Sequence, residues 1–315
     1  MGMRFGIDLG GTKIEIIALD KAGLLIYKKR IDTPKGDYHA TLDAITQLVL
    51  QAEVDLQSIG SVGVGIPGSI SHKTGKIKNA NSTWLIGQDL QGDLQHKLSR
   101  PVRVANDANC FALSEAIDGA AKGAQVVFGV IIGTGCGGGI VVNSQILNGV
   151  NAIGGEWGHN PLPWALETDE RLPCYCGLQG CNETFLSGSG LQQHYQKRAG
   201  LLVSERPLAK RKTTPLSAQQ IVALSEQGDS IASALMQDYY TWLAKGLASV
   251  INVLDPDVIV LGGGMSNIEA LYTEVPKIWQ QWVFSDQVNT KLLAPKYGDS
   301  SGVRGAAWLG ISSGR

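Results

Sequence analysis

The sequence predicts an α/β protein with two domains. Its 315 residues exceed the length of a typical single domain. A pattern of strand, glycine turn and strand opens the chain at residues 4–19 and returns at residues 126–142, where Phe128-Gly129-Val130 repeats Phe5-Gly6-Ile7. Other apolar strand patterns are followed by amphipathic helix patterns. We therefore expect duplicated α/β halves that face one another.

Composition and charge exclude several classes of protein. A net charge of −1 gives no electrostatic reason to bind nucleic acid or an anionic membrane. No apolar run reaches the roughly 18 residues of a membrane span, and the chain passes directly into a strand pattern without a signal peptide. Five cysteines, three of them within eight residues, fit reduced metal ligands better than disulfides. We expect a cytoplasmic protein without a membrane or nucleic-acid partner.

The first strand–turn–strand unit, residues 4–19, carries the motif Asp8-Leu-Gly-Gly-Thr12. A glycine turn of this kind can place backbone N–H groups and the Thr12 hydroxyl against phosphate oxygens. Asp8, at the end of its strand, would face the same space and could hold a hydrated magnesium ion. Taken alone, the motif favours an ordinary hairpin turn slightly over phosphate binding.

The next elements are a helix, a strand and a polar loop. Residues 37–53 have the pattern of an amphipathic helix, and residues 61–66 have that of a buried strand followed by Pro67-Gly68-Ser69. The polar loop at residues 79–84 ends at Trp84 and could form a wall for a hydroxyl-rich ligand. A surface loop anchored by this tryptophan is the alternative.

A short strand at residues 101–105 ends at Asn106-Asp107, and a helix follows to residue 121. An Asp between the carboxyl end of a strand and the start of a helix stands where α/β sheets usually bind ligands. Asp and Asn are also preferred helix N-caps, and this motif alone favours the cap.

The second strand–turn–strand unit changes which interpretation of the glycine turns is favoured, phosphate binding or an ordinary turn. Gly133-Thr-Gly135 repeats Gly10-Gly-Thr12, so the phosphates of a nucleotide would have two backbone cradles, one on each side of a cleft. Phosphate binding then becomes the favoured interpretation of both turns.

Residues 154–183 combine metal ligands with carboxylates. Thiolates and imidazole are ligands that zinc prefers, and they are supplied here by His159, Cys174, Cys176 and Cys181. Four protein ligands leave no position for an activated water, so the zinc would be structural. Glu156 and Glu183 bracket the cluster and could bond a polyol. We expect a zinc-clamped loop that presents a sugar pocket.

Three helices are predicted in the next part of the chain, at residues 186–198, 217–227 and 230–254. Lys210-Arg-Lys212 reads as a solvated loop. A buried strand at residues 258–261 ends in three glycines, which would allow the close approach of an adenine or its ribose. Ser266 is expected to cap a helix that begins near Asn267. A loop and a small-residue helix follow at residues 298–309.

These motifs, in this order and over essentially the whole chain, resemble the ROK (repressor, open reading frame, kinase) family of sugar kinases. The specific elements are Asp8-Leu-Gly-Gly-Thr12, Asn106-Asp107, Gly133-Thr-Gly135, Glu156-Trp-Gly-His159 and Cys174-x-Cys176-x4-Cys181-x-Glu183. The resemblance implies an actin-like, ribonuclease-H-like ATPase fold with two α/β domains around a deep cleft, and a homodimer. Residues 1–117 plus 300–315 would form the small domain, with the first phosphate loop and the catalytic Asp. Residues 118–299 would form the large domain, with the second phosphate loop, the zinc loop and the adenosine loop.

The resemblance also implies roles for single residues. Asp107 would be the catalytic base. Contacts to the sugar, or positions that shape them, are implied for Gly68, Asn81, Asn106, Glu156, His159 and Glu183. ATP, together with Mg²⁺, would be bound by Asp8, Gly10, Gly11, Thr12, Lys13, Gly133, Thr134, Gly135, Gly262, Gly263 and Gly264. Zinc would be held by His159, Cys174, Cys176 and Cys181.

Within the family, three segments are most similar to bacterial fructokinases, also described as manno(fructo)kinases. They are Asn79-Ala-Asn-Ser-Thr-Trp84, Glu156-Trp-Gly-His-Asn-Pro-Leu-Pro-Trp164 and Val258-Ile-Val-Leu-Gly-Gly-Gly-Met-Ser-Asn267. We expect ATP-dependent phosphorylation of fructose, and also of mannose, on the 6-hydroxyl. The alternatives are a kinase for glucose, mannose or an N-acetyl-hexosamine, and a sugar-sensing repressor. The repressor is disfavoured because the Asp8 motif leaves no room ahead of it for a helix-turn-helix domain.

Overall fold

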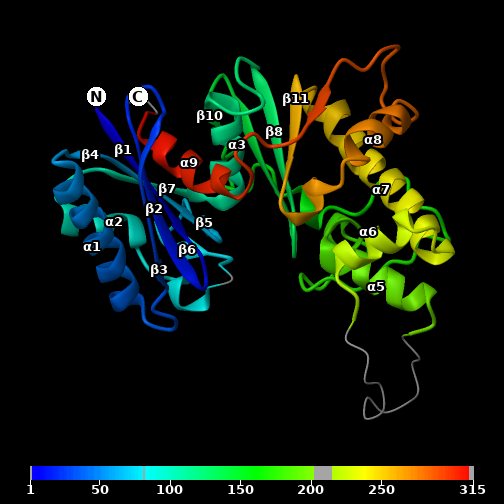
Figure 1. Cartoon of the computed structure of the whole chain (residues 1–315), viewed down its shortest axis with the longest axis horizontal. Coiled ribbons are helices and arrows are strands. Elements are labelled where there is room, and N and C mark those ends of the chain that lie inside the picture. Colours follow the sequence, from blue (N-terminus) through cyan, green and yellow to red (C-terminus); the bar gives the residue numbers. More distant parts are fainter. Residues whose placement is uncertain (1, 81, 202–214, 312–315) are drawn as a thin grey trace, which may run out of the picture. The chain divides into compact units, whose positions relative to one another are not determined.

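The computed structural model describes residues 2–80, 82–201 and 215–311 (Figure 1). Asn81 and the basic segment Lys210-Arg-Lys212 lie outside the described residues. The chain packs as two compact units. The first unit is Met1–Gly129, Gly139–Gly155 and Pro295–Arg315, and the second is Val130–Gly138 and Glu156–Ala294. Compared with the expected division at residues 117 and 300, the first unit takes in residues 118–129, 139–155 and 295–299 as well.

The first sheet has five strands in the order β3-β2-β1-β4-β7. They are β1 (Met3–Leu9), β2 (Lys13–Leu19), β3 (Leu25–Asp32), β4 (Gly60–Ile66) and β7 (Val102–Asn106). β1 pairs with β2 antiparallel through the predicted glycine turn, and β4 lies parallel to both β1 and β7. Since β1, β4 and β7 run the same way, their carboxyl ends meet at one edge of the sheet. Asp8 pairs with Gly65, and Ile66 pairs with Asn106, at that edge.

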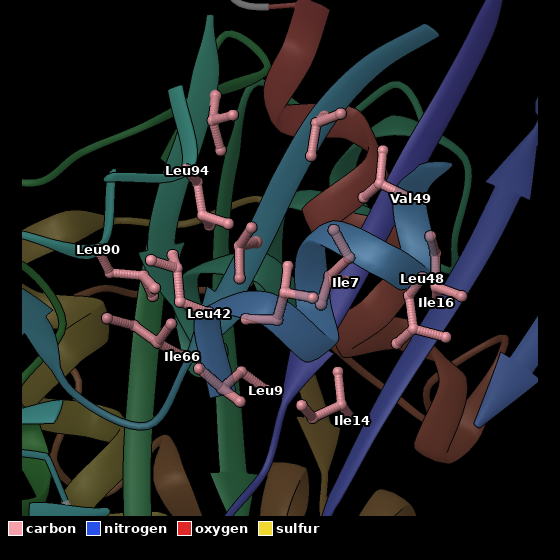
Figure 2. Packing of buried hydrophobic residues seen from close by; sticks show 14 of the residues in the cluster. Ile7, Leu9, Ile14, Ile16, Leu42, Leu48, Val49, Ile66, Leu90 and Leu94 are labelled. Atoms are coloured by element: carbon pink, nitrogen blue, oxygen red, sulfur yellow. The ribbon is translucent and has the colours of Figure 1, made fainter. Parts of the chain in front are cut away.

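One face of this sheet is covered by helices α1 (Tyr38–Leu56) and α2 (Leu90–Leu98). Asp37 caps α1, because its side chain accepts a hydrogen bond from the backbone N–H of Ala40. The predicted apolar face of α1, which includes Leu42 and Leu48, packs on Ile7 and its neighbours in the core (Figure 2). The helix predicted at residues 37–53 is therefore confirmed and is slightly longer.

Helix α9 (Ser301–Trp308) packs on strands β1, β2 and β4 and on helix α3 (Asp107–Ile117). Its close approach depends on two glycines. A Cβ on Gly6 would lie 2.2 Å from the carbonyl oxygen of Val303, and one on Gly63 would lie 1.9 Å from that of Ala306. Gly6 alternates with core residues along β1, so α9 covers the face opposite to α1. Helix α3 ends at Ile117, four residues before the predicted end.

The segment between β4 and α2 folds into a small hairpin and a short helical turn. Strands β5 (Ser69–Ile70) and β6 (Ile77–Lys78) pair antiparallel, and a 3₁₀ turn, η1, follows at Thr83–Leu85. Trp84 is partly buried against the core, and its indole Nε1–H donates to Thr41 Oγ1 of α1 at 3.3 Å. Trp84 thus anchors its loop to the helix, as the alternative interpretation expected.

The second sheet also has five strands, in the order β10-β9-β8-β11-β12. They are β8 (Val126–Ile132), β9 (Cys136–Val142), β10 (Gln145–Ile146), β11 (Val258–Gly262) and β12 (Lys291–Leu293). β9 and β10 are antiparallel, and β11 and β12 are parallel. When each sheet is numbered from its own first strand, both have the order 3-2-1-4-5. This shared topology confirms the predicted repeat.

The helices of the second unit are α4 (Asn182–Leu186), α5 (Gly188–Arg198), α6 (Ala218–Glu226), α7 (Ser230–Leu254) and α8 (Leu271–Trp279). Ser217 and Gln220 form a capping box at the start of α6, and Asp229 caps α7. Three of the largest fully buried side chains of the chain belong to this unit, namely Trp242, Trp279 and Tyr239. Among the described residues, no helix is both long enough and apolar enough to cross a membrane.

Two helix predictions in this unit are wrong in detail. The helix predicted at residues 186–198 is two helices, because Ser187 adopts an extended backbone and caps α5 through the N–H of Gly190. Ser266 does not cap a helix at Asn267: its hydroxyl donates to the carbonyl of Gly263 within a 3₁₀ turn, η4 (Gly264–Asn267). Helix α8 begins only at Leu271.

Candidate active site

Two aspartates lie at the carboxyl-end edge of the first sheet. Asp8 is near the end of β1, and Asp107 begins α3 directly after β7. The pKa of Asp8 is raised to about 6, first by burial and then by the negative charges of Asp107 and Glu15, against the opposing effect of Arg30. The two carboxylates are thus close enough to repel each other. Such a pair attracts a hydrated divalent cation, which prefers oxygen ligands.

The backbone around Asp107 is fixed by its neighbour. Asn106 is the N-cap of α3, because its Oδ1 accepts from the N–H of Ala108 at 2.9 Å. Its Nδ2 donates to the carbonyl of Gly68 at 3.1 Å. Asn106 therefore takes the capping role, while Asp107 occupies the first helical position with an exposed side chain. The positive end of the helix dipole favours the ionised carboxylate there.

Gly68 has a structural reason to be glycine. Its φ is +141°, and a Cβ would lie 2.9 Å from the carbonyl oxygen of Lys78. The turn after β4 can therefore approach β6 closely and present its carbonyl to Asn106. This contact links Gly68 and Asn106, two of the predicted sugar-site positions.

The first glycine turn connects β1 and β2. The N–H of Gly10 donates to the carbonyl of Lys13 at 2.9 Å, and the hydroxyl of Thr33 donates to the carbonyl of Gly10 at 2.8 Å. Gly11, Thr12 and Lys13 are exposed. The turn is well fixed, and its tip carries backbone N–H groups and the Thr12 hydroxyl, which are groups that can bind an anion. The Lys13 ammonium lies 3.7 Å from the carboxylate of Asp32.

Hydrogen bonds to all three of its carbonyl groups fix the second glycine turn, residues 133–135. The N–H of Gly133 donates to the carbonyl of Gly135, the N–H of Gly188 to that of Gly133, and the hydroxyl of Ser189 to that of Thr134, at 2.8–2.9 Å. With its three carbonyls bonded within the protein, this turn can offer its exposed Thr134 to an anion.

Two cavities share part of their lining, and one of them adjoins this turn. One of ≈ 330 Å³ is lined by Gly133, Thr134 and Gly264, and one of ≈ 410 Å³ extends from Gly264 toward α6 and α7. Both share Ala218, Gln219, Gly264 and Met265. The structure thus brings together the two glycine segments that the sequence assigned to phosphate and adenosine.

The three glycines after β11 differ in position. Gly262 ends the buried strand, and Gly263 has φ +80° with its Cβ position 2.6 Å from the carbonyl oxygen of Ile132. Gly264 alone of the three lines the cavities. The sequence interpretation missed Ala218, Gln219 and Ser189, which line the same space. The capping box at Ser217 and Gln220 was the only local signal of a fixed helix start beside it.

The four predicted metal ligands meet at one point. The ligand atoms of His159, Cys174, Cys176 and Cys181 all lie within 4.8 Å of one another. Cys174 Sγ is 3.5 Å from His159 Nδ1, and Cys176 Sγ is 3.6 Å from Cys181 Sγ. In a tetrahedral zinc site with ordinary bond lengths, such ligand pairs are separated by about 3.6–3.8 Å. The four residues therefore fit a zinc ion.

The polypeptide around the cluster is organised to hold these ligands. The N–H of Cys174 donates to the carbonyl of Leu178 at 2.8 Å, which closes a tight loop around Cys176. His159 Nε2 lies 2.9 Å from the hydroxyl of Tyr175. If Nδ1 faces the metal, Nε2 carries the proton and donates to this hydroxyl, an outer contact that orients the imidazole.

The two carboxylates beside the cluster are in different surroundings. Glu156 is exposed, whereas Glu183 is partly buried and its Oε2 accepts from the N–H of Cys136 at 3.0 Å. Burial raises the pKa of Tyr175, and the charges of Glu183 and Glu156 raise it further. Both carboxylates thus lie near enough to affect Tyr175 electrostatically, and the Tyr175 hydroxyl contacts His159.

The fold and these residues define a sugar kinase with an actin-like ATPase fold. More particularly, the chain belongs to the ROK family, whose family model matches residues 4–312. The chain is 39% identical over 318 residues to the N-acetyl-D-glucosamine kinase of Yersinia enterocolitica, with 98% of this chain and 100% of the relative covered.

Two solved structures show the same fold. The ROK hexokinase from Thermus thermophilus is 28% identical with a TM-score of 0.84, covering 99% of this chain and 100% of its own. A ROK glucokinase from Streptomyces griseus, in complex with glucose and AMPPNP, is 28% identical with a TM-score of 0.76 and the same coverage. The curated relative is a kinase for an acetylated amino sugar, so the predicted fructokinase subtype is not confirmed.

Proposed function

We propose that the protein transfers the γ-phosphoryl group of ATP to the 6-hydroxyl of a hexose, with Asp107 as the general base. The observation that carries this proposal is the pair Asp8 and Asp107 beside the first glycine turn. Phosphoryl transfer depends mainly on positioning and charge stabilisation. A base, a cation site and backbone donors for phosphate are the groups that it requires.

Asp107 accepts the proton of the 6-hydroxyl as that oxygen attacks the phosphorus. Its exposed side chain can reach a substrate, and its place at the start of α3 favours a negatively charged group. Asp8 is the residue that would hold Mg²⁺, through water. The cation would neutralise charge on the phosphate oxygens.

ATP is assigned to both glycine turns and to the cavities beside Gly264. Residues Gly10, Gly11, Thr12 and Lys13 would bind phosphate from the small domain, and Gly133, Thr134 and Gly135 from the large one. The ≈ 410 Å³ cavity is large enough for a nucleoside. In this proposal the small domain is residues 1–117 with 300–315, and the large domain is residues 118–299.

The sugar is assigned to Gly68, Asn81, Asn106, Glu156, His159 and Glu183. Zinc would be held by His159, Cys174, Cys176 and Cys181, and it would supply a rigid support for the loop. A homodimer is part of the proposal, and light scattering tests it.

We propose fructose as the preferred sugar, followed by mannose, on the similarity of three segments to fructokinases. The second candidate is N-acetylglucosamine, which the relative at 39% identity favours. These sugars differ by one hydroxyl position or one acetamido group, so a few contacts decide between them on a common fold.

The test is a coupled assay of ADP release with a panel of fructose, mannose, glucose, N-acetylglucosamine and N-acetylmannosamine. Zinc content is measured on the same sample. The highest kcat/KM is expected for fructose. A higher value for N-acetylglucosamine would overturn the choice of sugar, and no hexose-dependent ADP release at all would overturn the kinase proposal.

A further inference from the structure

Glu183 lies between the zinc cluster and the second glycine turn. Its Oε2 accepts from the backbone N–H of Cys136, the residue that directly follows the turn, at 3.0 Å. A Cβ built on Gly135 would lie 2.8 Å from that same oxygen. One oxygen of the Glu183 carboxylate is therefore hydrogen-bonded to the backbone at the end of the turn.

The backbone of Glu183 is itself held firmly. The preceding Asn182 donates from its N–H to the carbonyl of Asn160 at 2.8 Å and from its Nδ2 to that of Trp157 at 2.9 Å. The N–H of Ser187 donates to the carbonyl of Glu183 at 3.1 Å. Cys181, two residues before Glu183, is a ligand of the proposed zinc site.

The same region contacts the strand after the turn at a second point. The indole Nε1–H of Trp157 donates to the carbonyl of Gly137 at 3.1 Å. Gly158 approaches so closely that a Cβ would lie 2.0 Å from the carbonyl oxygen of Cys136. The zinc loop and the start of β9 are thus joined by several contacts, of which the one from Glu183 bears a charge.

We propose that Glu183 is a positioning residue for ATP: its carboxylate fixes the Gly135–Cys136 backbone, so that the turn is ordered before the triphosphate binds. This inference rests on the proposed kinase function and adds a nucleotide role to a residue assigned to the sugar. An ordered turn loses less conformational entropy when a ligand binds.

A competing effect makes the proposal testable. A carboxylate near the phosphate turn also repels the triphosphate, so its removal could strengthen nucleotide binding. Glu183→Gln removes the charge but keeps an oxygen that can accept from Cys136. Glu183→Asp keeps the charge but is one methylene shorter, so it cannot reach the same N–H group. Glu183→Ala removes both charge and acceptor.

The experiment measures the Kd of AMPPNP with Mg²⁺ by calorimetry, without sugar, on zinc-loaded full-length protein. Glu183→Ala and Glu183→Asp should bind AMPPNP about tenfold more weakly than wild type, while Glu183→Gln stays within twofold. Glu167→Gln is the matched control, because Glu167 is an exposed carboxylate of the same loop with no assigned contact to sugar, nucleotide or metal, and the change should leave this Kd unchanged.

Wild-type affinity in Glu183→Asp and Glu183→Ala, or tighter binding in Glu183→Ala, would overturn the proposal. An equal loss in Glu183→Gln would overturn it too, because that loss would assign the effect to charge. If wild type turns over a hexose while these variants bind AMPPNP normally, only this inference fails. If wild type neither turns over a hexose nor binds AMPPNP, the proposed function fails.

A second measurement does not depend on Glu183→Ala folding well. Gly135 lacks a left-handed φ, and apart from its chain neighbours the Glu183 carboxylate is the only group of the described residues within 4 Å of its Cβ position. Gly135→Ala should therefore weaken AMPPNP binding in wild type by pushing that carboxylate away. In the Glu183→Asp background, the same change should have a smaller effect. Additive effects in this double-mutant cycle would contradict the proposed contact.

Discussion

At the scale of the residue, the N–H of Ala108 at the start of α3 is accepted by two side chains, Asn106 Oδ1 at 2.9 Å and Asp107 Oδ1 at 2.8 Å. Asn106 caps α3 and bonds the carbonyl of Gly68, so the local backbone does not depend on the Asp107 side chain alone for its cap. A substitution of Asp107 can therefore test chemistry with little effect on the fold.

We expect Asp107→Asn to lower kcat by about 10²–10⁴-fold, the usual contribution of a general base. The amide has the same shape and cannot accept the proton. The dissociation constant of the sugar, measured by calorimetry without ATP, should change by less than about threefold. A near-normal kcat in this variant would show that another group is the base.

His194 provides a residue-scale test of stability. It is 3% exposed, and its ring packs on Phe185 and Trp242 with centroids 5.2 and 4.8 Å away. The pKa of His194 is lowered to about 4, first by burial and then by the nearby charge of Arg198. The folded protein thus keeps this ring neutral at pH values where the unfolded chain is protonated.

The sign of the pH dependence follows from linkage. Between about pH 6.5 and 4, the unfolded state binds more protons at His194, so stability falls as the pH falls. We expect wild type to lose on the order of 2–3 kcal/mol more than His194→Gln across this range. Urea denaturation of both proteins from pH 7.5 to 4 measures the difference. Parallel curves would contradict it, and loss of zinc at low pH affects both proteins alike.

At the scale of the element, the sequence is most informative where one segment determines its own structure. The two glycine turns, helix α7 and the four metal ligands follow from local patterns. The start of α8 does not, because Ser266 bonds Gly263 in a 3₁₀ turn that a capping preference cannot distinguish from a helix start. The cavity beside Gly264 is likewise missed, since Gln219 and Ser189 reach it from other helices.

At residues 154–183, the loop contains the four residues proposed to hold zinc. Cys174→Ser should lose zinc and raise the KM for the sugar by about tenfold or more, because His159 and its loop are no longer fixed. Tyr175→Phe removes only the hydroxyl beside His159 Nε2 and should have a smaller effect of the same kind. Metal analysis and steady-state kinetics measure both. A zinc-free Cys174→Ser protein with a normal KM would show that zinc is not needed to position His159 for sugar binding.

At the scale of the whole molecule, the sequence predicted two similar α/β halves because the pattern of strand, glycine turn and strand occurs twice. It could not predict which distant side chains meet. Arg304 of α9 donates to the carboxylate of Asp118, which lies 186 residues earlier, and to the carbonyl of Gly23 at 2.9 Å. Its guanidinium also stacks on Tyr297, 3.9 Å from the ring centre. Three separate parts of the first unit are joined at this one side chain.

Because the Arg304 side chain is only 7% exposed and that of Asp118 16%, their pair is a buried ion pair. We expect Arg304→Ala to destabilise the protein by about 3–5 kcal/mol, since it leaves the carboxylate of Asp118 buried without its partner. Arg304→Ala combined with Asp118→Asn should be less destabilised than the sum of the single changes, because no charge then remains unpaired. Urea denaturation at pH 7 measures all three variants. Additive losses would show that Arg304 acts through its packing on Tyr297 rather than through the ion pair.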